Sequence, residues 1–131
     1  GPLMRSEALI LLGPRDMKVR DPLLTAAREP FIQYDRKVVA GKMADEYLRG
    51  HGIKPKVRFE LDGIEQIAQL VAEGFGVSIL PDWPVLGPPD ARTRRWPLPP
   101  PSPSGEVGMV WLRSSVRSPL AAALSELVDY R

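Results

Sequence analysis

The stretch VRFELDGIEQIAQLVAEGFGVSILP, from Val57 to Pro81, decides the fold of this chain. A β-branched and apolar run meets an Asp-Gly pair, a helical pattern follows, and a Gly-x-Gly stop precedes another apolar run that ends in proline. The pattern predicts a strand, a helix and a second strand. So short a crossover is typical of a parallel βαβ unit, and α/β proteins bind ligands at the carboxyl ends of such strands.

Length and composition describe one small globular domain. The chain has 131 residues, 44% of them hydrophobic and 26% charged, which is enough to bury a core. The net charge of +2 is too small to indicate nucleic-acid binding. Cysteine is absent, and neither an apolar membrane span nor a secretory leader is visible. Gly1-Pro2-Leu3 resembles the remnant of a cleaved tag, so we expect a single domain over residues 4–131.

The rest of the chain alternates predicted strands and helices. We expect strands over 8–12, 31–34, 57–61, 77–80, 93–98 and 107–112, and helices over 22–27, 38–49, 63–73 and 119–128. Asp21, Asp35 and Asp62 are interpreted as helix N-caps, and Gly50, Gly52 and Gly74 as helix ends. This order predicts an α/β fold, a three-layer sandwich with a mostly parallel sheet.

Several motifs in this order resemble the effector-binding domain of LysR-type transcriptional regulators. Residues 29–35 read EPFIQYD, residues 70–81 read LVAEGFGVSILP, and the strand over 105–112 and the last helix complete the match. The resemblance spans most of residues 7–129. It implies one lobe of a fold similar to type 2 periplasmic binding proteins, which hold an effector between two lobes. It also implies a cytoplasmic, oligomeric bacterial regulator that is not an enzyme and carries no cofactor.

The chain departs from the complete pattern of that family. Complete regulators carry a helix-turn-helix and a first lobe, and neither is visible before Glu7. We therefore expect DNA to be bound only through a helix-turn-helix that this chain lacks. Whether the chain is an engineered fragment or a naturally shortened protein stays open.

The resemblance and the strand-end rule place the effector site in two loops. The expected effector-binding residues are Gln33, Tyr34, Asp35, Arg36, Lys37, Leu61, Asp62, Gly63 and Ile64. Arg36, Lys37 and the backbone N–H groups of their loop suit a small carboxylate or another anion. The competing interpretation is structural: Asp35 and Asp62 only cap helices, and the two basic side chains are solvated.

Other motifs have structural interpretations that fit better than functional ones. Gly74-Phe75-Gly76 is no dinucleotide motif, because Ile79 stands where a third glycine is needed. His51, the single histidine, has no second histidine or cysteine with which to form a metal site or triad, and we expect it to be exposed. We interpret Arg92, Arg94 and Arg95 as protection of an edge strand, and residues 97–104 as a stiff connector.

An alternative function and a surface for self-association are also predicted. A lobe of a solute-binding protein or of an enzyme on the same fold is the alternative, although no catalytic constellation is present. The last predicted helix carries an apolar stripe that would need a partner surface, so we predict a homo-oligomer built on it. Its residues are Leu120, Leu124, Leu127 and Val128.

Overall fold

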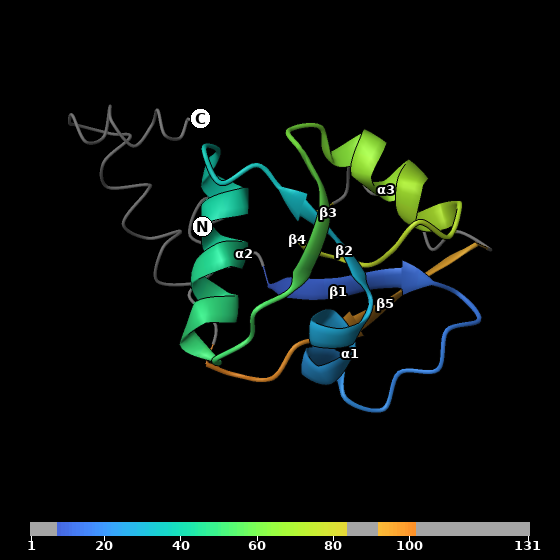
Figure 1. Cartoon of the computed structure of the whole chain (residues 1–131), viewed down its shortest axis with the longest axis horizontal. Helices are drawn as coiled ribbons and strands as arrows, with labels where there is room; N and C mark the ends of the chain where they lie inside the picture. The colour runs from blue at the N-terminus through green and yellow to red at the C-terminus, as the bar shows by residue number, and fades with distance from the viewer. Residues whose placement is uncertain (1–7, 84–91, 102–131) are drawn as a thin grey trace.

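The computed structural model describes residues 8–83 and 92–101 (Figure 1). The strands are β1 (Leu9–Pro14), β2 (Pro30–Tyr34), β3 (Lys56–Leu61), β4 (Ser78–Pro81) and β5 (Thr93–Pro97), and the helices are α1 (Pro22–Arg28), α2 (Val39–Gly50) and α3 (Ile64–Ala72). Each predicted element within the described residues is confirmed, with ends that shift by one or two residues. The predicted strand over 107–112 and the helix over 119–128 lie outside the described residues.

The strands form a three-stranded sheet in the order β4-β1-β5 and a two-stranded sheet, β2-β3. The β2–β3 pair is parallel, and a parallel bridge between Phe31 and Val77 joins β2 to the chain just before β4. The Ser78 hydroxyl supports this junction by donating to the Ile32 carbonyl over 2.6 Å. The predicted crossover is therefore confirmed: β3 and β4 run parallel on either side of β2.

The expectation of a mostly parallel sheet is only partly correct, because β1 pairs antiparallel with both β4 and β5. β2 runs opposite to β1, because β1 is antiparallel to β4 whereas β2 is joined by a parallel bridge to the residue just before β4.

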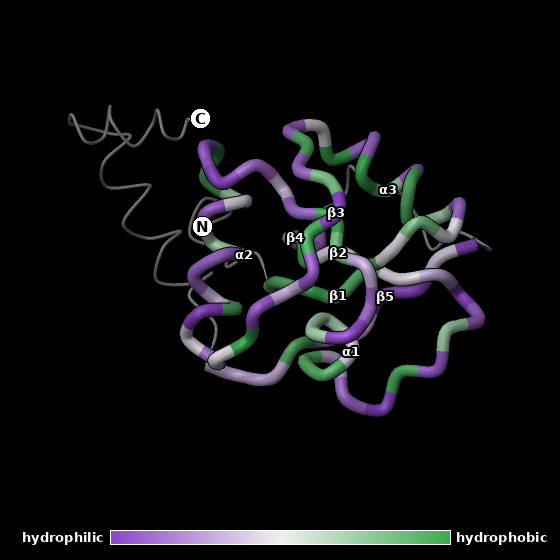
Figure 2. Tube along the Cα trace, viewed as in Figure 1, coloured by the Kyte–Doolittle hydropathy of each residue, from purple (hydrophilic) through white to green (hydrophobic). Residues whose placement is uncertain are grey.

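The two faces of β1 bury two apolar clusters. Leu9 and Leu11 face the cluster that α1 and α2 cover, while Ile10 and Leu12 face the cluster that α3 covers. Figure 2 shows β1 as a continuous apolar strand in the middle of the molecule. Helices thus lie on both faces of the strands, which confirms the three-layer α/β architecture.

The predicted helix ends are correct at Asp21, Gly52 and Gly74 and wrong at Asp35 and Asp62. Asp21 accepts the N–H groups of residues 23 and 24, and both glycines have positive φ angles of 71° and 87°. The N-cap of α2 is Val38 and that of α3 is Gly63, and neither makes a side-chain cap hydrogen bond. The Asp35 carboxylate instead accepts the Lys37 N–H over 2.9 Å, which closes a turn before the helix begins.

Candidate functional site

The two predicted effector loops meet at one end of the molecule. Because β2 and β3 are parallel neighbours, their carboxyl ends lie together, and the Asp35 N–H donates to the Leu61 carbonyl over 2.8 Å. Figure 1 shows both strand ends at the top, with the first turns of α2 and α3 beside them. The structure thus brings the 33–37 segment and the 61–64 segment to one edge.

Most of the loop after β2 is committed to internal hydrogen bonds. The Arg36 guanidinium donates from Nε and Nη2 to the two Glu60 carboxylate oxygens, both over 3.0 Å, and the Arg36 N–H also donates to Glu60. The Val38 N–H donates to the Asp35 carbonyl. This hydrogen-bonded pair holds the pKa of Glu60 below its usual range. Arg36 therefore fixes the loop to β3, a role that differs from the predicted contact with an anion.

The first turns of α2 and α3 supply donors that the loop does not. A helix leaves its first N–H groups without intrahelical partners, and they carry partial positive charge. Neither N-cap residue makes a side-chain cap hydrogen bond to these N–H groups. α2 has 12 residues and α3 has 9, so both are long enough for this effect to develop.

Three side chains of the predicted set stand at this edge. Lys37 and Asp62 are exposed, and Tyr34 is nearly buried with 8% of its surface exposed. Burial, with a smaller contribution from the Asp62 carboxylate, raises the pKa of Tyr34 above its ordinary value of 10.0. Its protonated hydroxyl is a hydrogen-bond donor. Gln33 is also buried and donates from Nε2 to the Tyr34 carbonyl over 2.7 Å, so it braces the strand end.

Gly41 shapes this edge and was not among the predicted residues. A Cβ on Gly41 would lie 1.9 Å from the Asp35 carbonyl oxygen, so only glycine lets the loop cross the first turn of α2 this closely. Glycine inside a helical pattern is itself a signal of close packing, and that signal was available in the sequence. Glu60 was also missed, because its pairing with Arg36 links residues 24 apart.

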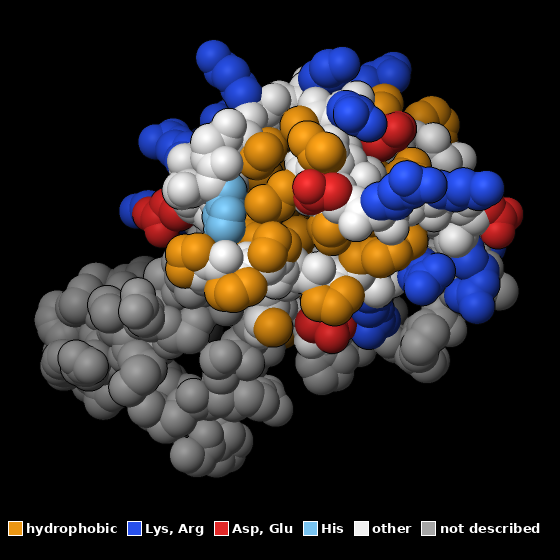
Figure 3. Space-filling model, turned by 90° about the horizontal axis from the view of Figure 1, so that it is seen from below, with side chains coloured by type: hydrophobic (Ala, Val, Ile, Leu, Met, Phe, Trp, Pro, Cys, Tyr) orange, Lys and Arg blue, Asp and Glu red, His pale blue; other side chains and the backbone are white. Residues whose placement is uncertain are grey.

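The opposite end of the molecule holds His51, which is half-buried and not exposed as predicted. Its ring lies 4.3 Å from that of Tyr47, and its Nε2 is 2.9 Å from the Pro101 carbonyl. The Tyr47 hydroxyl donates to the Pro99 carbonyl. These contacts fix the start of the proline tract against the end of α2. Figure 3 views this end and shows apolar side chains around the histidine.

The basic run also has structural partners. Arg94 lies over the Trp96 ring at 5.3 Å, and Arg95 pairs with Asp82 over 2.9 Å. Within the described ranges, no group of three potential metal ligands is present, and no helix has the length and hydropathy of a membrane span.

The described residues form an α/β lobe in which two loops meet at the carboxyl ends of two parallel strands. A family model described as "LysR substrate binding domain" matches residues 2–130. The chain belongs to this family of substrate-binding domains, and its curated relative is a transcriptional regulator. The resemblance seen in the sequence is thereby confirmed.

Individual relatives support the same assignment. The chain is 27% identical over 127 residues to an uncharacterized HTH-type transcriptional regulator, YybE, of Bacillus subtilis, covering 94% of this chain and 43% of that protein. A putative LysR family regulator from Pseudomonas aeruginosa has a TM-score of 0.63 at 23% identity, covering 80% of this chain and 41% of that one. The Synechocystis CcmR regulatory domain, solved in complex with 2-PG, has a TM-score of 0.59 at 19% identity, with coverages of 70% and 48%. The chain thus spans less than half the length of these proteins.

Proposed function

We propose that this domain senses a small anionic effector for a LysR-type transcriptional regulator and binds it at the carboxyl ends of β2 and β3. The observation that supports the proposal is the meeting of the two strand ends beside two helix N-termini that have no side-chain caps. Such an edge attracts anions through N–H groups and partial positive charge. The complex of CcmR with 2-PG is a precedent for a small ligand in a domain of this fold.

The binding residues within the predicted set divide into two groups. Lys37, the Tyr34 hydroxyl and the N–H groups that follow Val38 and Gly63 would contact the effector. Gln33, Asp35, Arg36 and Leu61 would hold the edge in shape, because they already bond within the protein. Asp62 would stand exposed beside them. Ile64 begins α3 and contributes its N–H. A small carboxylate would suit the N–H groups of the two helix N-termini and the Lys37 ammonium group.

The wider biological role is proposed from the family. The domain would act in the cytoplasm within an oligomeric regulator, without catalysis or cofactor, and would reach DNA only through a helix-turn-helix. Closing on the effector would shift the geometry of the oligomer. The stripe Leu120, Leu124, Leu127 and Val128 lies outside the described residues and remains the predicted surface for self-association.

A thermal-shift screen with acetate, benzoate and inorganic phosphate tests the binding proposal. Because the described edge offers contacts from one sheet only, we expect a Kd of about 1 mM, or about −4 kcal/mol. At tenfold excess over Kd this stabilises the protein by about 1.4 kcal/mol, a shift of a few degrees. Lys37→Ala should abolish the shift, while Lys54→Ala, an exposed lysine just before β3, should preserve it. Equal shifts in both variants would refute the site.

A further inference from the structure

Gln33 is a buried polar side chain at the carboxyl end of β2, and only one end of its amide group has a partner. The residue is 2% exposed, and its Nε2 donates to the Tyr34 carbonyl over 2.7 Å. Because a carbonyl only accepts, the amide nitrogen must face it, which leaves the amide oxygen, Oε1, on the other side of the group. Within residues 8–83 and 92–101, no group donates a hydrogen bond to Oε1.

A buried acceptor in this state is unusual. Nearly all buried polar atoms in folded proteins have a hydrogen-bond partner, because an unpaired one bears the full cost of its removal from water. The buried hydroxyls of Ser78 and Tyr47 follow this rule, since they donate to the carbonyls of Ile32 and Pro99. Oε1 of Gln33 therefore needs a donor from a water molecule or from a ligand, and its position decides between the two.

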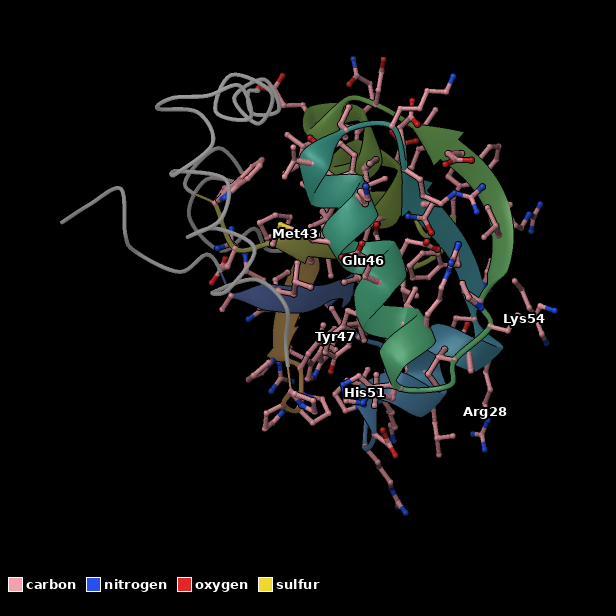
Figure 4. All side chains as sticks on the ribbon, turned by 90° about the vertical axis from the view of Figure 1, so that its left-hand side faces the viewer. Arg28, Met43, Glu46, Tyr47, His51 and Lys54 are labelled. Carbon is pink, nitrogen blue, oxygen red and sulfur yellow. The ribbon has the colours of Figure 1, made fainter. Side chains whose placement is uncertain are left out.

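The Gln33 amide lies between the end of β2 and the first turn of α2. Successive residues of a strand face opposite sides, so Gln33 shares the face of Phe31, which packs in the cluster that α1 and α2 cover. The Tyr34 carbonyl, which holds the amide, lies against the first turn of α2, where a Cβ on Gly41 would come within 2.5 Å of it. Figure 4 shows this turn at the top, at the opposite end of α2 from His51.

The same turn offers donors for an anion. α2 begins at Val39, and its N-cap residue, Val38, makes no side-chain hydrogen bond to the N–H groups of the first turn. These N–H groups and the Lys37 ammonium group suit a carboxylate. A buried acceptor thus lies beside a group of donors. An effector that pairs with both must carry a hydrogen-bond donor close to its carboxylate.

We propose that Oε1 of Gln33 accepts a hydrogen bond from the effector, and that the domain prefers a short carboxylic acid with a hydroxyl or amino group next to its carboxylate. This preference rests on the anion site proposed above and narrows its class of ligand. An acid without the donor group would exclude water from Oε1 and give it no partner, which weakens binding. Gln33 is then a specificity-determining residue, while its Nε2 still holds the strand end.

¹⁵N NMR titrations of the whole chain with propionate, L-lactate, D-lactate and L-alanine test this preference, because the four molecules share one carbon skeleton. We expect a lactate or alanine to bind about tenfold more tightly than propionate, which corresponds to about 1.4 kcal/mol. Comparison of the lactates with alanine distinguishes a hydroxyl donor from an amino donor. The side-chain amide signals of Gln33 should shift with the tighter ligand and not with propionate.

The titrations separate this preference from the anion site itself. Saturable binding of all four molecules with equal Kd values would overturn the preference and leave the site in place. No saturable binding by any of them would remove both.

Substitution of Gln33 distinguishes recognition of the ligand from support of the strand. Gln33→Met removes the acceptor and keeps a side chain of similar length, so it should reduce the affinity for the preferred acid to that for propionate and leave propionate binding unchanged. A purely structural role would weaken both acids alike. Gln69→Met, at an exposed position in α3, is the matched control and should retain the preference.

Circular dichroism verifies that both variants are folded. If Gln33→Met does not fold, the side-chain amide shifts of the native chain decide the question. A folded Gln33→Met variant that still prefers the hydroxyl or amino acid would contradict the proposal.

Discussion

Strands β1 and β3 differ in burial and in the number of strands that pair with them among the described residues. Leu11 in β1 is fully buried, and β1 has hydrogen-bonded neighbours on both sides. β3 is exposed along five of its six residues, and within residues 8–83 and 92–101 it pairs with β2 alone. The sequences explain the difference: LILL is a continuous apolar run, whereas KVRFEL alternates charged and apolar residues. A continuous run is typical of a strand covered on both faces, and alternation of a strand that meets water.

The same comparison separates the tasks of the two regions. β1 holds the two apolar clusters together, because its side chains alternate between them. β3 contributes little to the core, because five of its six residues are exposed. Its carboxyl end forms half of the candidate site. Stability should therefore depend on β1, and binding should depend on β3.

Truncation of one side chain in each strand gives the largest expected contrast. Leu11→Ala leaves a cavity in a fully buried position and should lower the free energy of unfolding by about 2–5 kcal/mol. Val57→Ala removes methyl groups from a half-exposed position and should cost less than about 1 kcal/mol. Urea denaturation followed by circular dichroism measures both values. Similar losses in the two variants would contradict the assignment of the core to β1.

Gly41 and Gly50 give the next contrast within α2, at the two ends of the helix. Gly41→Ala drives a Cβ into the Asp35 carbonyl and should destabilise the fold by about 2–4 kcal/mol. Gly50→Ala meets no atom within 4 Å and should be neutral or stabilise by up to about 1 kcal/mol. Thermal denaturation of both variants tests this prediction. A well-folded Gly41→Ala variant that keeps its anion response would show that the loop does not need its close approach.

Substitution of Tyr47 should give the smallest change in stability at neutral pH. Tyr47 lies in the apolar cluster that Leu9 and Leu11 of β1 face. Its ring is 1% exposed, and burial raises its pKa from 10.0 to about 12. The folded state therefore retains this proton longer than the unfolded state, and stability present below pH 10 is lost as pH rises through 12. A shift of this size corresponds to a few kcal/mol, on the order of 1.4 kcal/mol for each pKa unit. Tyr47→Phe should lose about 1 kcal/mol at neutral pH, with its bond to Pro99, and its stability should fall less steeply above pH 10.

Chemical denaturation at intervals from pH 7 to pH 12 measures the Tyr47 effect. The other tyrosines and the lysines titrate in both proteins, so the difference between native and Tyr47→Phe curves isolates this residue. Parallel curves would mean that Tyr47 has the same pKa in the folded and unfolded states.

Local signals in the sequence predicted most of the fold. The Asp21-Pro22 pair, the Gly74 stop and the apolar periods located the elements correctly, because each depends on residues close in the chain. The direction of β1 was missed, because its antiparallel pairing with β4 and β5 joins residues far apart in the chain and leaves no local pattern. The caps at Asp35 and Asp62 were wrong for a related reason: Asp forms turns as readily as it caps helices.

The candidate site could be predicted at the level of loops but not of side chains. Parallel pairing of β2 and β3 follows from the βαβ rhythm, so the meeting of the 33–37 and 61–64 segments was accessible. The commitment of Arg36 to Glu60 was not accessible, because a tertiary contact between distant residues leaves no pattern in one sequence. Because Arg36 is paired with Glu60, Lys37 and the two helix N-termini are the groups that we expect to contact an anion.

A ¹⁵N NMR titration of the native chain with benzoate tests the central claim most directly. The claim is that the carboxyl ends of β2 and β3, with the first turns of α2 and α3, bind a small anion. We predict saturable shifts, with a Kd of about 1 mM, concentrated in the amides of residues 37–41 and 63–66. Shifts concentrated instead in residues 51–54 at the opposite end, or no saturable shift with benzoate, acetate or phosphate, would contradict it.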